Sequence, residues 1–348
     1  MPVADAYVPW EDFDGSTVVV TGATGLVGGA VAEALLAHNG RVGDADKIRV
    51  VVPARSELRV RERFGECDDL TFVEWDAVAG EVQGSSDVPS ISACDFIIHC
   101  AAPTASAFFV ERPVETIEAI VGGTRSMLHL AGRTHARMVF ASSMEVYGAF
   151  SGDDPLDESL VGPLDSMSVR SSYPQAKQLA ETLLAAHVAE HGTRACAARL
   201  AQTFGAGVSA DDRRVFAHIV RTALAGDDVR LATAGTKSNM YVATPDAVSA
   251  LLLLAARGDA GCAYNVANED TFCSVRDMAE QVVRRFGAPD ARVVLGTDAA
   301  AGGKFPPATR MRLDVGRLRA LGWRPTMGLM DMYDELVASW STSAGGTA

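Results

Sequence analysis

The sequence has no excess of positive charge, and this narrows the range of its partners. Its 31 Lys and Arg against 44 Asp and Glu give 348 residues a formal net charge of -13. Binding to a nucleic-acid backbone depends largely on clustered cations, so we expect no nucleic-acid partner. An anionic small ligand is compatible with this charge, because a few local arginines or helix amino termini outweigh a distant net charge.

The sequence also lacks paired cysteines and long apolar runs. Its six cysteines form no C-x-x-C pair and no zinc-like spacing with histidine, which favours free thiols in a reducing compartment and indicates no metal site. The longest apolar stretch, Ala247 to Ala256, is about half the roughly 20 residues of a membrane span. The acidic amino terminus is not typical of a signal peptide. We therefore expect a cytoplasmic protein that binds no membrane.

Short apolar segments alternate with helical patterns over the first two thirds of the chain. Such alternation predicts a parallel sheet with helices on both faces, and burial of both faces explains why the strands are almost continuously apolar. We expect an α/β, Rossmann-type doubly wound sheet over 17–205 and about 239–268. The predicted strands are 16–22, 47–55, 70–77, 94–102, 136–143 and 193–201, with helices over 26–38, 114–131 and 173–191.

The pattern becomes less regular after about residue 205. A smaller α/β part is expected over 206–238 and 269–340, and it contains a Gly/Pro-rich loop at 296–310. Residues 1–16 are expected to form a tail, and 341–348 to be disordered. Helices are predicted over 215–225, 246–257, 274–287 and 329–340.

Three glycines follow the first predicted strand and open the first helix, in the segment TGATGLVG (21–28). Glycine permits a tight turn and the close approach of a pyrophosphate, and the helix amino terminus offers free N–H groups with partial positive charge. The strand–turn–helix context makes the motif more specific than a glycine triplet alone. We predict a dinucleotide site formed by Gly22, Thr24, Gly25, Leu26, Val27 and Gly28.

The choice between NAD and NADP depends on the end of the second strand. An acidic residue there would accept a hydrogen bond from the ribose 2′-hydroxyl of NAD, but this strand ends with Pro53, Ala54 and Arg55. Arg55 could bind the 2′-phosphate of NADP, stack on the adenine or remain solvated. Asp76, after the third strand, is a candidate for the adenine edge. We expect NAD, with NADP as the alternative.

Tyr173 and Lys177 are four residues apart, so a helix places them on one face. Pro174 suits the first turn of that helix. A free tyrosine has a pKa near 10, and a nearby ammonium together with a positive nicotinamide ring would lower the pKa and favour the phenolate. Tyr173 could then remove a hydroxyl proton while hydride leaves the same carbon. Ser143 is placed to bind the reacting oxygen, and Glu145 is a candidate acid, base or ligand of a sugar hydroxyl.

Together these motifs resemble the extended short-chain dehydrogenases, and among them the NAD-dependent epimerase/dehydratase family of nucleotide-sugar enzymes. The resemblance covers about residues 17–340. HCAAPTAS followed by RPVETI, the SMEVYG segment and Arg170 to Tyr173 are similar to the UDP-glucuronate decarboxylase branch. The segments that carry the family resemblance are TGATGLVG (21–28), HCAAP (99–103), ASSMEVYG (141–148), YPQAK (173–177), RLAQTFGAG (199–207), AYNVANED (263–270) and LGWRP (321–325).

The resemblance implies a reaction sequence. Tyr173, supported by Lys177 and Ser143, would oxidise the C4 hydroxyl of a sugar while NAD takes the hydride. The ketone acidifies neighbouring positions, so decarboxylation, elimination or epimerisation becomes accessible, and the hydride often returns. The resemblance also implies a homodimer through a helix pair that includes 173–191.

The resemblance further implies where the ligands lie. Ala101 and Ala102 would contact the cofactor, and Pro103 the sugar. The smaller part of the chain would bind the diphosphate of the nucleotide sugar, with Gln202, Arg214, Lys237 and Arg312 as candidates.

Some positions depart from the family pattern. Met144 stands where the 4,6-dehydratases carry Asp, which disfavours dehydration. Lys237 replaces an Arg of the decarboxylase branch, and an ammonium cannot reproduce bidentate recognition. Gln202 and Ile120 each replace an Asn. Two other functions stay open: a net NADP-linked reductase of a keto-sugar or another carbonyl compound, and a non-catalytic dinucleotide-binding protein.

Overall fold

Seven parallel strands form the central sheet of the computed structural model, which describes residues 5–78, 91–104, 106–150, 152, 154–297 and 309–344. The strand order is β10-β6-β5-β4-β1-β2-β3. The Rossmann-type α/β prediction is confirmed, and its six strands are joined by a seventh, β10. The bounds are β1 Thr17–Thr21, β2 Arg49–Ala54, β3 Leu70–Glu74, β4 Phe96–His99, β5 Arg137–Ser143, β6 Arg194–Leu200 and β10 Ala263–Val266.

The strand order reverses between β1 and β4, which are neighbours in the sheet. In register, Val18 of β1 lies opposite Val50 of β2 on one side and Phe96 of β4 on the other. Ligands of open α/β sheets bind outside the carboxyl ends of the strands at such a reversal. The topology therefore places a ligand crevice at the carboxyl ends of β1 and β4.

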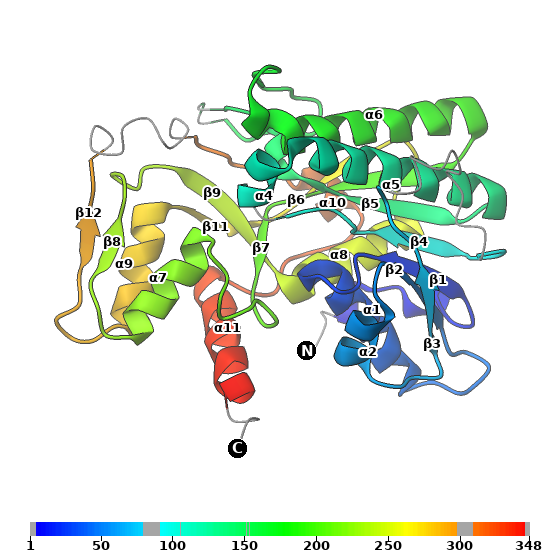
Figure 1. Ribbon diagram of the computed structural model, residues 1–348, viewed down its shortest axis with the longest axis horizontal. Coiled ribbons are helices and arrows are strands. Elements are labelled where there is room, and N and C mark those ends of the chain that lie inside the picture. Colours follow the sequence, from blue (N-terminus) through cyan, green and yellow to red (C-terminus); the bar gives the residue numbers. More distant parts are fainter. Residues whose placement is uncertain are drawn as a thin grey trace.

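Helices cover both faces of this sheet, as Figure 1 shows. Alternate residues of β1 explain the two layers: Val18 and Val20 belong to one buried cluster, and Val19 belongs to another. The first cluster packs under α1 (Leu26–Asn39), α2 (Glu57–Phe64) and α8 (Thr244–Arg257), and the second under α4 (Ser106–Glu111), α5 (Pro113–Thr134) and α6 (Ser172–His191).

The longest apolar run of the sequence lies in α8. Its residues from Thr244 to Ala255 are all buried, between the sheet and α1. Among the described residues, every helix is too short or too polar to span a lipid bilayer.

The C-terminal part has its own buried cluster, which includes Phe204, Phe216, Tyr241 and Tyr333. Its strands form a three-stranded sheet, in the order β11-β9-β7, and a parallel pair, β12 and β8. The strands are β7 Gln202–Phe204, β8 Val229–Leu231, β9 Ser238–Ala243, β11 Asn268–Ser274 and β12 Val293–Leu295, and the helices are α7 Val215–Leu224, α9 Val275–Phe286, α10 Gly316–Ala320 and α11 Leu329–Ala344.

Both ends of the chain differ from expectation. The expected tail over 1–16 is wrong for residues 5–16, which contain two short 3-10 helices, Asp5–Tyr7 and Trp10–Asp12. Phe13 is fully buried, and Trp10 stacks on His38 with ring centroids 4.3 Å apart. These aromatic side chains bind the segment to the fold. Helix α11 continues through 341–344, which were expected to be disordered. Most of the predicted 296–310 loop, residues 298–308, lies outside the described residues.

Candidate active site

The glycine turn connects β1 directly to α1, with Gly25 as the residue that precedes the helix. Gly22 has a φ of 70°, and a Cβ there would lie 2.8 Å from the backbone nitrogen of Ala101. A Cβ on Gly28 would lie 2.5 Å from the carbonyl oxygen of Gly22. Both positions therefore require glycine, Gly22 for the tight turn and Gly28 for the close packing of α1 against that turn.

A buried hydrogen-bond chain fixes this turn to the end of β4. The Ala101 N–H donates to Thr21 Oγ1 at 3.1 Å, and Thr21 Oγ1 lies 2.7 Å from His99 Nδ1. His99 Nε2 lies 3.3 Å from Thr124 Oγ1, which donates to the carbonyl of Ile120. Burial lowers the pKa of His99 to about 3, so the ring is neutral and can donate through one nitrogen while it accepts through the other.

The remaining cofactor candidates lie at the same edge of the sheet. Arg55 is exposed one residue beyond β2, where no acidic side chain stands. Asp76 follows β3 and accepts a hydrogen bond from the Val78 N–H at 2.9 Å. Ala101 and Ala102 follow β4 and are half-buried. This cradle, with its glycines and the free N–H groups of α1, fits a dinucleotide.

Tyr173 lies in the first turn of α6 and is only 8% exposed. Its ring stacks on Phe109 of α4, with centroids 4.3 Å apart and planes 11° apart. Burial raises the pKa of the Tyr173 phenol above its ordinary value, and the charge of Glu145 raises it further. A hydrogen bond with Ser143 and the charge of Arg170 oppose this rise in pKa.

Lys177 is 2% exposed and lies one turn after Tyr173. Its ammonium donates to the Ala141 carbonyl at 2.6 Å and lies 4.4 Å from the Phe140 ring centroid, but 5.8 Å from the Tyr173 ring centroid. Burial lowers the pKa of Lys177 to about 8. The ammonium points to a carbonyl. The lowering of the Tyr173 pKa, which also involves a positive nicotinamide ring, stays a prediction.

Glu145 belongs to a charged group beside Tyr173. Its Oε2 accepts a hydrogen bond from Arg170 Nη2 at 3.0 Å, and its N–H donates to Ser143 Oγ at 3.2 Å. Burial lowers the pKa of Lys237, whereas the charge of Glu145 raises it and that of Arg170 lowers it. The carboxylate of Glu145, which acts on the phenol, therefore interacts with two cations.

The other candidates in the C-terminal part are not all brought together. Gln202 opens β7 and pairs in register with Tyr241 of β9. The segment containing Arg312 runs beside the start of β9, where Met311 N donates to the Ser238 carbonyl at 2.9 Å. Lys237 immediately precedes Ser238, so Arg312 and Lys237 lie on adjacent segments.

Arg214 is bound to a neighbour instead. Its Nη2 lies 2.7 Å from Asp212 Oδ2, and its guanidinium lies over the Phe216 ring at 4.7 Å. These contacts hold the Arg214 side chain at the start of α7, and its contact with a diphosphate stays a prediction.

Arg170 and Phe109 are site residues that the sequence patterns did not predict. A signal for Arg170 was available, because it precedes Tyr173 by three residues and a helical turn brings such residues together. Phe109 had no comparable signal, since α4 was not predicted and stacking between two helices leaves no local pattern.

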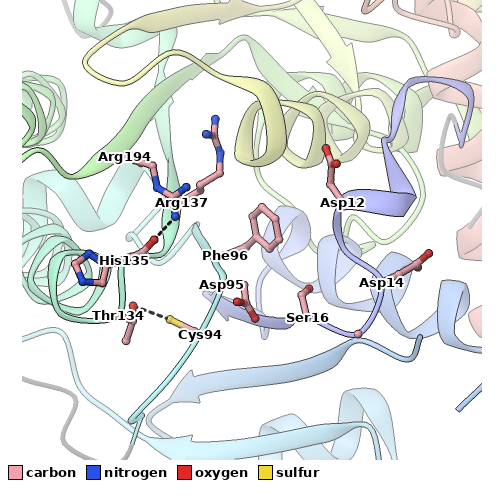
Figure 2. A pocket seen from close by; sticks show the side chains of 11 residues that line it. Asp12, Asp14, Ser16, Cys94, Asp95, Phe96, Thr134, His135, Arg137 and Arg194 are labelled. Atoms are coloured by element: carbon pink, nitrogen blue, oxygen red, sulfur yellow. Dashed lines mark hydrogen bonds between the residues drawn. The ribbon is translucent and has the colours of Figure 1, made fainter. Parts of the chain in front are cut away.

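A separate cavity of about 590 Å³ lies at the opposite edge of the sheet, at the amino ends of β1, β4, β5 and β6 (Figure 2). Its charged lining is already paired. Asp12 binds Arg257 at 2.6 Å, Asp14 binds His38 at 2.8 Å, and Arg137 donates to the Ala255 carbonyl at 2.8 Å. None of the candidate site residues lines it.

Comparisons with known proteins add independent findings. Residues 18–267 match the NAD dependent epimerase/dehydratase family. UDP-glucuronic acid decarboxylase 6 of Arabidopsis thaliana is 32% identical over 243 residues, which are 68% of this chain and 67% of the relative.

Two solved structures share the fold. An epimerase from Methanothermobacter thermautotrophicus has a TM-score of 0.77 at 22% identity and covers 97% of this chain and 96% of its own. The dTDP-glucose 4,6-dehydratase of Bacillus anthracis, in complex with NAD, has a TM-score of 0.74 at 16% identity and covers 95% of this chain and 98% of its own.

Proposed function

The chain belongs to the NAD dependent epimerase/dehydratase family, and from this premise we propose that it oxidises the C4 hydroxyl of a nucleotide-diphosphate sugar through Tyr173 and then epimerises or decarboxylates the keto-sugar. The observation that carries the proposal is the position of Tyr173. The phenol is buried beside Ser143 and Lys177, at the edge of the sheet where the glycine turn lies.

NAD is the proposed cofactor and would accept and return the hydride at the sugar carbon. The glycine turn and the first N–H groups of α1 would hold its pyrophosphate. Arg55 and Asp76 would flank its adenosine, and Ala101 and Ala102 would line the approach to the nicotinamide. The NAD complex of the Bacillus anthracis dehydratase supports this choice.

Tyr173 would move the proton. Because burial raises its pKa, the phenol keeps its proton near neutral pH and can donate it to a ketone oxygen. The positive charge of an oxidised nicotinamide nearby would lower the pKa and favour the phenolate for the first step. Ser143 would bind the same oxygen, and Lys177, one helical turn after Tyr173, would orient the phenol ring.

Glu145 is the proposed second acid–base group. It lies near Tyr173 and is held by Arg170, so it could exchange a proton at a sugar position next to the ketone. Decarboxylation has specific support from the UDP-glucuronic acid decarboxylase relative and from the two cations, Arg170 and Lys237, which would attract a carboxylate. Epimerisation uses the same ketone and stays the alternative outcome.

A net NADP-linked reductase is the second candidate function. The exposed Arg55, with no acid at the end of β2, favours it. That function predicts steady consumption of NADPH with a ketone substrate, whereas the first predicts no net change in the cofactor.

A second copy of the chain is the proposed partner. Val114 and Ile117 of α5 and Leu179 of α6 are exposed apolar side chains on two helices that pack against each other. Pairing of this face with itself would bury them in a homodimer. Light scattering of the wild type and of an Ile117→Glu, Leu179→Glu variant tests this, with a dimer expected only for the wild type.

The reaction is tested by incubating the protein with UDP-, dTDP-, GDP- and CDP-sugars, including uronates, and measuring product mass. Loss of carbon dioxide identifies decarboxylation, and an unchanged mass with a new sugar on hydrolysis identifies epimerisation. Turnover without Tyr173, or turnover only as net NADPH oxidation, would contradict the first proposal.

A further inference from the structure

We propose that Arg63 is a positioning residue for the cofactor turn, acting through the peptide group at the amino end of α1. The proposal deepens the proposed function and rests on it, because it requires a dinucleotide to bind over the glycine turn. Arg63 belongs to α2 and lies 38 residues from Gly25 in sequence.

The guanidinium of Arg63 joins two turns of α1. Its Nη1 donates to the Gly25 carbonyl at 2.7 Å, and its Nε donates to Glu33 Oε1 at 2.9 Å. Its Nη2 lies 2.8 Å from the same carboxylate oxygen. The side chain of Arg63 is 24% exposed, so it lies on the partly solvated side of α1.

The contact at the Gly25 carbonyl fixes the orientation of a hydrogen-bond donor of the turn, the N–H of Leu26. The Gly25 carbonyl also accepts the first helical bond from Gly29 N at 3.0 Å, so Arg63 occupies its second lone pair. A peptide group is planar, so a fixed Gly25 carbonyl also fixes the Leu26 N–H on the opposite side. Leu26 N–H is among the free donors at the start of α1, which are the donors that bind phosphate.

Gly29 provides a second, independent observation. It stands in the helix outside the three-glycine motif, where glycine is less stable than alanine. An ideal Cβ at this position would lie 1.9 Å from Cζ of Arg63, and its three nearest atoms all belong to the Arg63 guanidinium. The absent side chain at Gly29 therefore makes the room in which the Arg63 guanidinium lies.

Glu33 determines what kind of role Arg63 has. Its carboxylate neutralises Arg63, so the pair adds little net charge to the cofactor site. Arg63 differs in this from the exposed Arg55, whose guanidinium is a candidate to contact a ligand directly. Arg63 therefore orients the turn rather than attracting phosphate.

The test compares Arg63→Met with Arg61→Met. Arg61 lies on the same short helix and pairs with Glu57 and Glu66, away from the turn, so it is the matched control. Titration with NADH should show about tenfold weaker binding for Arg63→Met, which loses a charge-assisted hydrogen bond, and wild-type affinity for Arg61→Met. Arg63→Lys should recover part of the affinity, because one ammonium cannot serve both partners.

Gly29→Ala separates positioning from general stability. It should weaken NADH binding as much as Arg63→Met does, because the methyl group displaces the guanidinium, while the melting temperature stays the same or rises. The double variant should bind no more weakly than either single variant. The affinity for the nucleotide sugar should not change in any of them.

Wild-type NADH affinity in Arg63→Met, or additive losses in the double variant, would overturn the role of Arg63 and leave the proposed function intact. A wild-type protein that binds no dinucleotide would overturn both.

Discussion

The carboxyl edge of the seven-stranded sheet and the C-terminal segments hold their candidate residues in different ways. At the carboxyl edge of the sheet, Tyr173, Lys177 and His99 are buried and fixed by stacking or hydrogen bonds. On the C-terminal side, Arg312 is exposed and Lys237 is half-buried. The first region can preserve a reaction geometry, whereas the second can adapt to different substrates.

Tyr173→Phe is expected to give the largest effect. It keeps the stack on Phe109 but removes the proton donor and acceptor, so kcat should fall about 10³-fold, with a small change in KM. Tyr264→Phe is the matched control, because this buried tyrosine bonds Asp259 in the connection between α8 and β10. Equal turnover in the two variants would exclude Tyr173 as the group that moves the proton.

Glu145→Gln is expected to be next in size. The amide keeps the shape of the side chain but loses the acid–base function and the charge that pairs with Arg170, so kcat should fall about 10²-fold. Product analysis should show that the C4 oxidation persists while the later step is slow. A normal ratio of product to oxidised intermediate would assign Glu145 a purely structural role.

The pH dependence of kcat should report the loss of the positive charge of the buried Lys177. Lys177 is protonated below its pKa of about 8 and loses its charge above it, so kcat should decline on the alkaline side of that value. The affinity for the nucleotide sugar should show no matching change there. Lys177→Arg, which stays protonated, should move the decline to higher pH, and a decline that stays in place would exclude Lys177 as its cause.

Lys237→Met and Arg214→Met compare two cations of the C-terminal part. Loss of Lys237 should raise KM for the nucleotide sugar about tenfold, the effect of one lost charge-assisted contact. Loss of Arg214, which is bound to Asp212, should change KM less than about twofold. A larger effect at Arg214 would mean that substrate displaces its carboxylate partner.

The two regions also differ in what their sequence reveals. The glycine turn and the Tyr173–Lys177 pair were predictable, because a strand–turn–helix and an i, i+4 spacing are local patterns. β10 escaped prediction because its pairing with β6 is set by tertiary structure. The packing of Phe13 and the contact of Arg63 with Gly25 escaped for the same reason, since both join distant segments.

The charged group around Glu145 shows how much of the site could be predicted from the sequence. The SMEVYG segment identified Glu145, but its interactions with Arg170 and Lys237 depend on how the segments before α6 and before β9 pack in three dimensions. Arg214 is a candidate through the family resemblance, and its ion pair with Asp212 is a local contact between residues two positions apart.

Whether Tyr173 drives the oxidation of the sugar can be tested by following the reduced nicotinamide in a single turnover. Cofactor-loaded protein is mixed rapidly with the nucleotide sugar that the product screen identifies, and the absorbance of NADH is recorded. We expect a transient rise and decay of the NADH absorbance in the wild type and in Tyr264→Phe, and no rise in Tyr173→Phe. An equal transient in Tyr173→Phe would contradict the role of Tyr173. Product in chemically quenched samples of the wild type, with no transient in the NADH absorbance, would contradict oxidation by the cofactor.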